Sequence, residues 1–156
     1  MRVALAADHG GAALKAELLG RLAAAGHEMI DLGGDGGDPA DDYPDVARAA
    51  GDAVRDGLVE RAIVVCGSGI GASVAASKLR GVRAAVAHDT YSARQGVEHD
   101  DLNVLCLGAR VIGVELAAEV ARTFLASRFS GEERHRRRLA KIAAIEAAEL
   151  DLEVPR

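Results

Sequence analysis

A cysteine and a run of glycines stand together near the middle of the chain, in the segment "AIVVCGSGIGASVAASK" (62–78). Cys66 ends a short apolar run that is typical of a buried strand, and Gly67, Gly69 and Gly71 precede an alanine-rich helical pattern. Glycines let a backbone approach a ligand closely, and the N–H groups at a helix N-terminus favour negative charge. The segment therefore predicts a thiolate base beside a set of N–H groups that can hold an oxyanion.

Other interpretations of this loop are weaker. Gly67, Gly69 and Ala72 match the spacing of a dinucleotide-binding loop, and Asp89 follows about twenty residues later. That loop normally follows the first strand of its domain and needs no thiol, whereas this one follows the third. A cysteine phosphatase loop needs arginine six residues after the cysteine, where Ala72 stands. Cys66 can also be a small buried hydrophobe, which is the favoured interpretation for Cys106 inside "NVLCLG".

Further groups suited to proton transfer or anion binding follow predicted strands and helices. Asp8 and His9 come directly after the first apolar run, although Asp8 can instead cap the next helix. His99 ends a predicted helix, where it can equally be a cap or a solvated side chain. Arg134 and Arg138 share one helix face, which suits either a phosphate clamp or a solvated surface.

Apolar runs alternate with helical patterns along the whole chain, which predicts a parallel sheet covered on both faces. We expect a three-layer α/β/α fold with a five-stranded parallel Rossmann-like sheet. The expected strands are 2–8, 27–33, 61–66, 82–88 and 103–108; the expected helices are 11–26, 45–57, 71–81, 90–99, 113–127 and 131–150, with a loop over 34–44. Ligands of such sheets bind at the carboxyl ends of the strands.

Length and composition narrow the class of protein. The 156 residues predict one domain, residues 1–156, and the net charge of −5 with no Trp, two Tyr and two Phe argues against a nucleic-acid partner. No apolar stretch is long enough for a membrane span, and the N-terminal residues do not resemble a signal peptide. Two free thiols in such a chain suggest a cytoplasmic setting.

The segment 131–150 follows an α/β unit that is already complete. Its largely apolar stripe, interrupted by Glu146, needs burial. We therefore expect a C-terminal dimerisation helix that packs on a partner subunit, in a homodimer or a dimer of dimers.

Six stretches together resemble the ribose-5-phosphate isomerase B family, which includes galactose-6-phosphate isomerase subunits and allose-6-phosphate isomerase. They run from residue 4 to about residue 142 and are "ADHGG", "DYP" (42–44), "CGSGIGASVAASK", "RAAVAHDTYSAR", "HDDLNVLCLGARVIG" and "RHRRRLAKI". The resemblance implies a sugar-phosphate aldose–ketose isomerase that works through a cis-enediolate, with no metal or organic cofactor. Ribose 5-phosphate and ribulose 5-phosphate are the first expected substrate pair, ahead of tetrose and hexose phosphates.

The resemblance also implies roles for single residues. His99 with Asp8 would help to open the sugar ring, and Cys66 would move a proton between C1 and C2. The enediolate oxygen would be held by N–H groups of the loop, assisted by the Ser68 hydroxyl, and Tyr43 would contact the sugar. The loop residues concerned are Gly67, Gly69, Ile70 and Gly71, and the phosphate-binding positions are His9, Arg110, Arg134 and Arg138.

One departure and two rival functions accompany this resemblance. Asp100 stands where the family usually has an asparagine that touches the sugar. Ala72 stands where members without the cysteine place a glutamate, so the role of base falls to Cys66. Asp100 and the loop 33–42 therefore affect the expected choice of sugar. The rivals are a catalytically silent sugar-phosphate-binding subunit, against which the intact set of Cys66, His99 and Asp8 argues, and a dinucleotide-binding module.

Overall fold

Five parallel strands form one sheet at the centre of the protein, whose structure is a computed structural model that describes residues 1–38 and 40–150. The spatial order of the strands is β2-β1-β3-β5-β4. Strands β1, β3 and β5 are almost entirely buried, as their continuous apolar sequences require, and β2 and β4 form the edges. Their bounds are Arg2–Ala7 (β1), Glu28–Asp31 (β2), Arg61–Cys66 (β3), Ala84–Val86 (β4) and Val104–Gly108 (β5).

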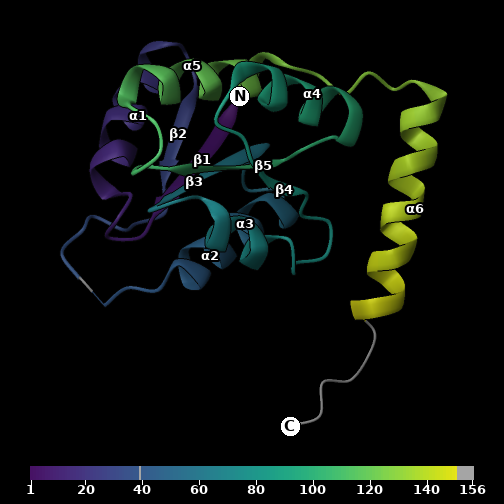
Figure 1. The fold of residues 1–156 in the computed structure, drawn as a ribbon, viewed down its shortest axis with the longest axis horizontal. Helices are drawn as coiled ribbons and strands as arrows, with labels where there is room; N and C mark the ends of the chain where they lie inside the picture. Colours follow the sequence, from purple (N-terminus) through teal and green to yellow (C-terminus); the bar gives the residue numbers. More distant parts are fainter. Residues whose placement is uncertain (39, 151–156) are drawn as a thin grey trace, which may run out of the picture.

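Five helices cover the two faces of the sheet and a sixth lies apart from them (Figure 1). Helices α1, α4 and α5 pack on one face, and α2 and α3 pack on the other. The predicted three-layer α/β/α fold with a parallel sheet is confirmed. The bounds are Ala12–Ala24 (α1), Tyr43–Arg55 (α2), Ile70–Ala76 (α3), Thr90–Asp100 (α4), Val114–Ala126 (α5) and Glu133–Leu150 (α6).

The two faces of the sheet have cores of different size. On the α1, α4 and α5 face the core contains large side chains, among them Leu18, Leu22 and Phe124. The leucines of α1 that were expected to line one helix face, 14, 18 and 22, are all buried there. On the α2 and α3 face the core is mostly alanine and valine, which lets these two helices approach the sheet closely.

Three predicted elements differ from the observed ones at their ends. Helix α2 begins at Tyr43, inside the expected loop 34–44, because Pro44 is well tolerated in a first helical turn. Helix α3 ends at Ala76 instead of residue 81, because the N–H groups of Lys78, Leu79 and Val82 bond to carbonyls three residues back. Strand β4 covers only residues 84–86 of the expected 82–88.

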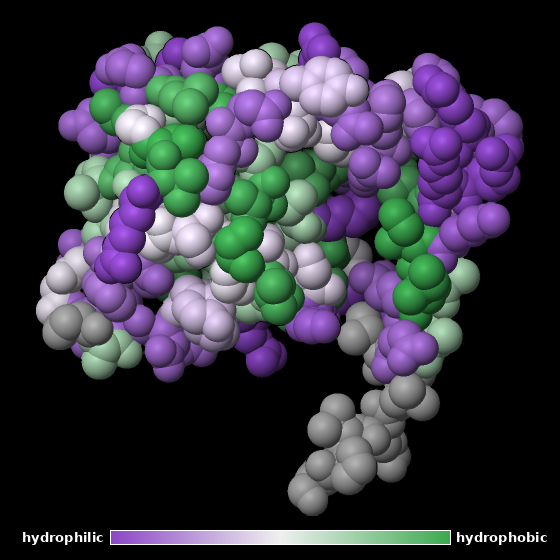
Figure 2. Space-filling model, viewed as in Figure 1, coloured by the Kyte–Doolittle hydropathy of each residue, from purple (hydrophilic) through white to green (hydrophobic). Residues whose placement is uncertain are grey.

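Helix α6 leaves the body of the protein and runs beside it (Figure 1). Near its far end Glu146 accepts a hydrogen bond from the N–H of Gly81 at 2.8 Å. A groove of about 920 Å³ lies between α6 and the body, and Leu139, Ile142, Ala143 and Ile145 line it from the helix side. Figure 2 shows hydrophobic residues on the side of α6 that faces the body.

In the part of the chain that the structure describes, no helix combines the length and the apolar character that a crossing of the bilayer demands.

Candidate active site

The strand order places a crevice at the carboxyl edge of β1 and β3. The chain leaves β1 toward β2 on one side and later returns to β3 on the other, so the loops after β1 and β3 diverge at this point. They also touch, because the N–H of Asp8 donates to the carbonyl of Val65 at 3.3 Å. A Cβ on Gly11 would lie 2.2 Å from the same carbonyl oxygen, so only glycine allows this approach.

Cys66 lies at the end of β3 with its sulfur turned toward the following loop. The thiol is buried, and its Sγ accepts a hydrogen bond from the N–H of Gly69 at 3.1 Å. Gly69 has a φ of +82°, a left-handed conformation that turns the backbone back over the cysteine before α3 begins. The N–H of Ile70 donates to the Ser68 hydroxyl at 3.2 Å. The sequence predicted that loop N–H groups lie beside this thiol. The N–H of Gly69 does so.

The loop after β1 brings Asp8 and His9 beside the cysteine loop. Asp8 is buried, and its Oδ1 accepts the N–H of Gly11 at 3.1 Å, so it fixes the turn into α1 without being the N-cap residue itself. A Cβ placed on Gly10 would lie 3.5 Å from the nitrogen of Gly67, which shows how closely the two loops approach. Asp8 and the Cys66 loop thus belong to one crevice.

His9 is held by a carboxylate from a distant loop. Oδ1 of Asp41 accepts the backbone N–H of His9 at 2.8 Å and lies 2.6 Å from its ring Nδ1. The hydrogen bond to Asp41 raises the pKa of the exposed His9 imidazole, and the charge of Asp8 acts in the same direction. The same bonds lower the pKa of Asp41. His9 is therefore an imidazole that favours its cationic form, as an anion site requires.

Tyr43 and Arg110 complete this group from two further elements. The Tyr43 ring lies against Gly71, where a Cβ would come within 2.7 Å of ring carbons. The side chain of Arg110 passes over Gly67, and its backbone N–H donates to the Gly67 carbonyl at 3.0 Å. The structure thus brings together ten of the sequence-predicted site residues, namely Asp8, His9, Tyr43, Cys66, Gly67, Ser68, Gly69, Ile70, Gly71 and Arg110.

The remaining four predicted residues lie at the other edge of the sheet. Helix α4 starts beside the carboxyl end of β4, where Asp89 is its N-cap, and runs back about 16 Å to the amino edge. His99 and Asp100 occupy its last turn, and Arg134 and Arg138 project from the exposed first half of α6. Within one chain, this second group is therefore separated from Cys66 by about the length of a strand.

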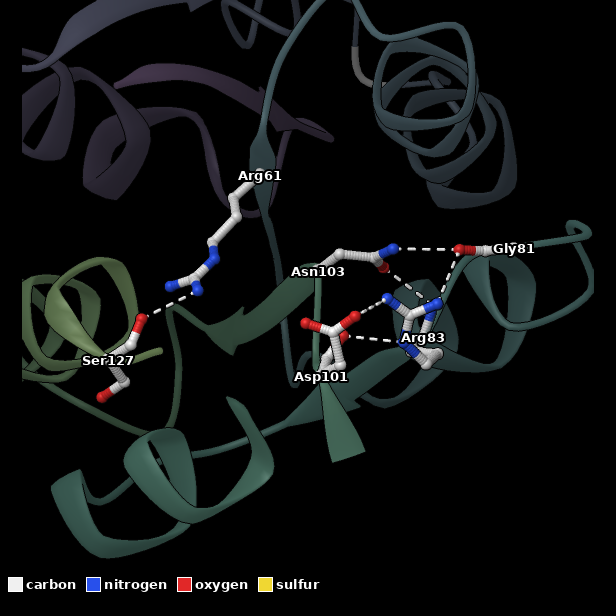
Figure 3. Close-up of polar contacts among 6 residues, drawn as sticks. All are labelled: Arg61, Gly81, Arg83, Asp101, Asn103 and Ser127. Carbon is white, nitrogen blue, oxygen red and sulfur yellow. Dashed lines mark hydrogen bonds and ion pairs between the residues drawn. The ribbon is translucent and has the colours of Figure 1, made fainter. Parts of the chain in front are cut away.

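A polar network fixes the end of α4 where His99 and Asp100 lie (Figure 3). Arg83 donates to the main-chain carbonyl and to the carboxylate of Asp101, each at 2.7 Å. Asp101 has a φ of +49° and ends the helix in a left-handed conformation. Asn103 joins the network by accepting from the N–H of Arg83 and donating to the Gly81 carbonyl. Arg61 lies nearby, where it donates to the carbonyls of Phe124 and Ser127 at the end of α5.

The dinucleotide-binding interpretation of the loop finds little support in this geometry. Asp89, which matched the ribose-binding position of a dinucleotide site, accepts the N–H of Ser92 at 2.7 Å and caps α4. Across residues 1–38 and 40–150, no three His, Cys, Asp or Glu side chains gather where they could ligate a metal ion.

Sequence reasoning missed two residues that touch predicted ones, Asp41 and His135, and also the role of His88, which contacts Gly108 close to Arg110 in the chain. Asp41 lies among several aspartates of a loop, and only the fold shows which of them meets His9. His88 accepts the N–H of Gly108 at 2.9 Å and so braces the end of β5 next to Arg110. The ring of His135 stacks on His99, a contact between α6 and α4. For His135, the available sequence signal is its position as a histidine between two arginines, Arg134 and Arg136.

Comparison with known proteins agrees with the assembled crevice. The family model described as "Ribose/Galactose Isomerase" matches residues 3–142. Ribose-5-phosphate isomerase B of Escherichia coli is 40% identical, over 93% of this chain and 96% of that protein. D-erythrulose-4-phosphate isomerase 2 of Mycolicibacterium smegmatis is 39% identical, over 76% of this chain and 78% of that protein. The structure of type B ribose 5-phosphate isomerase from Trypanosoma cruzi superimposes with a TM-score of 0.91 at 43% identity, covering 96% of this chain and 100% of that one.

These similarities extend over nearly the whole chain and include both groups of predicted site residues. Identity near 40% over such a length, together with the same fold, leaves no other family to consider. The chain therefore belongs to the ribose/galactose isomerase family and is a sugar-phosphate isomerase of the ribose-5-phosphate isomerase B type.

Proposed function

We propose that the protein interconverts ribose 5-phosphate and ribulose 5-phosphate, with Cys66 as the base. The observation that carries this proposal is the hydrogen bond from the Gly69 N–H to the Cys66 sulfur, inside a crevice that also contains Asp8, His9 and Arg110. The sulfur lies at a strand end beside these groups, and the thiolate is the form of cysteine that can remove a proton. Cys106 cannot take this role, because burial raises the pKa of its thiol to about 12.

The proton transfer follows from these positions. The Cys66 thiolate removes the proton from C2 of the open-chain aldose, and the electrons of that C–H bond form the enediolate. The protonated thiol then returns a proton to C1, and the proton on the sugar oxygens moves from O2 to O1. N–H groups of residues 67–71 and the Ser68 hydroxyl stabilise the negative oxygen between these two steps. Tyr43 lies over Gly71, where it can contact the sugar.

Phosphate binding requires positive groups at the far end of the sugar. His9 favours its cationic form because of Asp41, and Arg110 lies in the same crevice. Arg134 and Arg138 are the further phosphate ligands in this proposal. They lie at the other edge of the sheet together with His99 and Asp100, so a second copy of the chain must supply all four.

The active unit is accordingly a homodimer with two shared sites. The groove of about 920 Å³ between α6 and the body, lined by apolar side chains, gives a second copy a place to dock. His99 of the partner subunit would open the sugar ring in concert with Asp8. Residues 131–150 would then be the dimerisation helix of a single isomerase domain.

Subunit mixing tests the shared site directly. Cys66→Ala and His99→Ala homodimers should each be nearly inactive, because a general base or acid contributes about 10²–10⁴-fold. If each site combines Cys66 of one chain with His99 of the other, an equimolar mixture that exchanges subunits regains one intact site in each heterodimer. Statistical mixing should therefore restore about a quarter of the wild-type rate. No regain after exchange, verified by mass spectrometry of the heterodimer, would place the whole site within one chain.

A tetrose 4-phosphate is the second candidate substrate. Asp100 stands where the family usually carries asparagine, and a D-erythrulose-4-phosphate isomerase is nearly as similar to this chain as ribose-5-phosphate isomerase B. Coupled assays with tetrose 4-, pentose 5- and hexose 6-phosphates decide between the candidates by the ratio of kcat/KM values. If the protein binds these sugars but converts none of them, it is a non-catalytic subunit and the proposal fails.

A further inference from the structure

His135 is unusual among the side chains of α6. It is only 1% exposed, whereas Arg134 and Arg136 on either side of it are exposed. Among the described side chains of that helix, no other is classed as buried. A histidine is a costly residue to bury on an otherwise exposed helix, because its polar ring must be desolvated. The burial of His135 therefore needs a specific explanation.

The His135 ring contacts the Ser130 hydroxyl and the ring of His99. Nδ1 lies 2.6 Å from the Ser130 hydroxyl, and the ring stacks on that of His99 with centroids 4.1 Å apart and planes 28° from parallel. Nε2 is buried and has no hydrogen-bond partner. Burial lowers the pKa of His135, and the neighbouring His99, Arg134 and Arg138 lower it further, against an opposite effect of Glu132. The buried ring is therefore neutral at physiological pH.

Two side chains, Gln95 and His135, hold the ring of His99. Its Nδ1 lies 3.0 Å from Nε2 of Gln95, one helical turn earlier in α4, and His135 covers one face of its ring. Nδ1 is thus committed to Gln95, which leaves Nε2 as the ring nitrogen that can meet a substrate oxygen. The Ser130 N–H donates to the carbonyl of Glu98 at 3.0 Å, so the segment that carries His135 is itself tied to the end of α4.

We infer that His135 is a positioning residue: its buried ring holds the His99 imidazole by stacking, in the orientation that ring opening requires. This inference rests on the proposed function. It depends on the stacking of the His135 ring on the His99 ring where α6 meets α4. The His135 ring is buried, and its Nε2 has no hydrogen-bond partner. Stacking needs an aromatic face but not the His135 nitrogens, and this difference can be tested.

The chemistry of the two sugars separates ring opening from proton transfer. Ribose 5-phosphate is almost entirely a closed furanose and must be opened before Cys66 can act. Ribulose 5-phosphate cannot form a furanose, because its O5 carries the phosphate. Ribulose 5-phosphate therefore enters the site as an open chain, and Cys66 can exchange a hydrogen on its C1 with solvent through the enediolate without any ring step. A defect in the positioning of His99 should slow isomerisation in both directions, as the fixed equilibrium constant requires, and spare this exchange.

The experiment compares His135→Ala, His135→Phe and the control Arg137→Ala, an exposed change on the same helix. In His135→Ala, kcat with ribose 5-phosphate should fall at least about 10-fold, because a misplaced catalytic group loses most of its effect. The rate at which solvent deuterium enters C1 of ribulose 5-phosphate, followed by NMR in D2O, should stay within about twofold of wild type. His135→Phe, which keeps the stacked face, should retain most of the forward rate, and Arg137→Ala should match wild type.

Each other outcome overturns the inference. Equal loss of isomerisation and of C1 hydrogen exchange means that His135 supports the fold or the dimer, and no loss of either means that His99 needs no support. A His135→Phe variant as slow as His135→Ala means that the nitrogens, and not the stacking, matter. If the wild-type protein converts neither sugar, the proposed function fails, and the imidazole NMR signals of His99 then decide the inference. These signals should shift and broaden in His135→Ala and remain sharp in His135→Phe.

Discussion

A single carboxylate oxygen, Oδ1 of Asp41, accepts the backbone N–H of His9 at 2.8 Å and lies 2.6 Å from its ring Nδ1. Asp41 belongs to the loop between β2 and α2, and His9 to the loop between β1 and α1. The pair therefore joins two loops of the crevice, holds the His9 ring in one orientation and raises the pKa of its imidazole through the hydrogen bond to Asp41.

Removal of the Asp41 charge should make substrate binding more sensitive to pH. The pKa of His9 is raised, so its cation persists to higher pH than that of a free histidine and is lost as the pH rises through the raised value. In Asp41→Asn this loss should occur at lower pH. KM should then rise about three- to tenfold at pH 8 and stay near wild type at pH 5.5, where His9 is protonated in both proteins.

Asp38→Asn is the matched control for this prediction. Asp38 lies in the same loop, but its carboxylate accepts the N–H of Ala40, a contact that asparagine preserves. Its KM should follow the wild-type profile between pH 5.5 and pH 8. An equal rise of KM in Asp41→Asn at both pH values would mean that Asp41 shapes the loop without affecting the charge of His9.

Cys66 should be indispensable for turnover and dispensable for binding. Cys66→Ala removes the sulfur that accepts the Gly69 N–H, and kcat should fall by about 10² or more while KM changes little. Cys106→Ala is the comparison, because that thiol is buried in β5. This variant should unfold at a somewhat lower temperature and keep its kcat. Near wild-type turnover in Cys66→Ala would reject the assignment of the base.

Arg134 and Arg138 should contribute to substrate binding in both the ground state and the transition state. Their charges lie on the exposed side of α6, one helical turn apart, which suits two contacts to one phosphate dianion. Arg134→Ala and Arg138→Ala should each raise KM with a smaller effect on kcat, and inorganic phosphate should become a weaker competitor. Arg137→Ala should show neither change, and a fall in kcat alone would contradict the phosphate role.

Asp100 should influence which sugar is preferred. A carboxylate only accepts hydrogen bonds, whereas an amide can also donate one, so Asp100→Asn changes what a nearby hydroxyl group meets. The ranking of kcat/KM values for tetrose, pentose and hexose phosphates should change between wild type and this variant. An unchanged ranking would show that Asp100 does not select the sugar.

A charge on the groove side of α6 should weaken the dimer. Ile145 is 65% exposed in a single chain and lines the groove, whereas Ala144 does not line it. Ile145→Glu should raise the dimer dissociation constant in sedimentation measurements and lower the specific activity on dilution, because an unpaired charge would be buried at the contact. Ala144→Glu should leave both unchanged. If Ile145→Glu remains dimeric at nanomolar concentration, the groove is not the dimer contact.

The sequence predicted those parts of the fold and site that depend on local patterns. Continuous apolar runs are typical of buried parallel strands. The spacing of the leucines in α1 predicts a buried helix face, and the spacing of the glycines after Cys66 predicts the loop that meets its sulfur. Strand order depends on contacts between distant residues, so the placement of β5 between β3 and β4 could not be inferred from spacing. His99 is separated from Cys66 within one chain because α4 runs from the carboxyl edge of the sheet back to the amino edge. The partners Asp41 and His135 were missed for a similar reason, since neither is near its histidine in sequence.

Helix α6 also has a consequence for the order in which the protein regains structure and activity. The body carries both cores of the sheet without it, so residues before α6 can fold as one first-order process. Docking of a second copy in the groove beside α6 is a bimolecular step. After dilution from denaturant, far-ultraviolet circular dichroism should therefore recover at a rate independent of protein concentration. Isomerase activity should return later, with a half-time that shortens as the protein concentration rises.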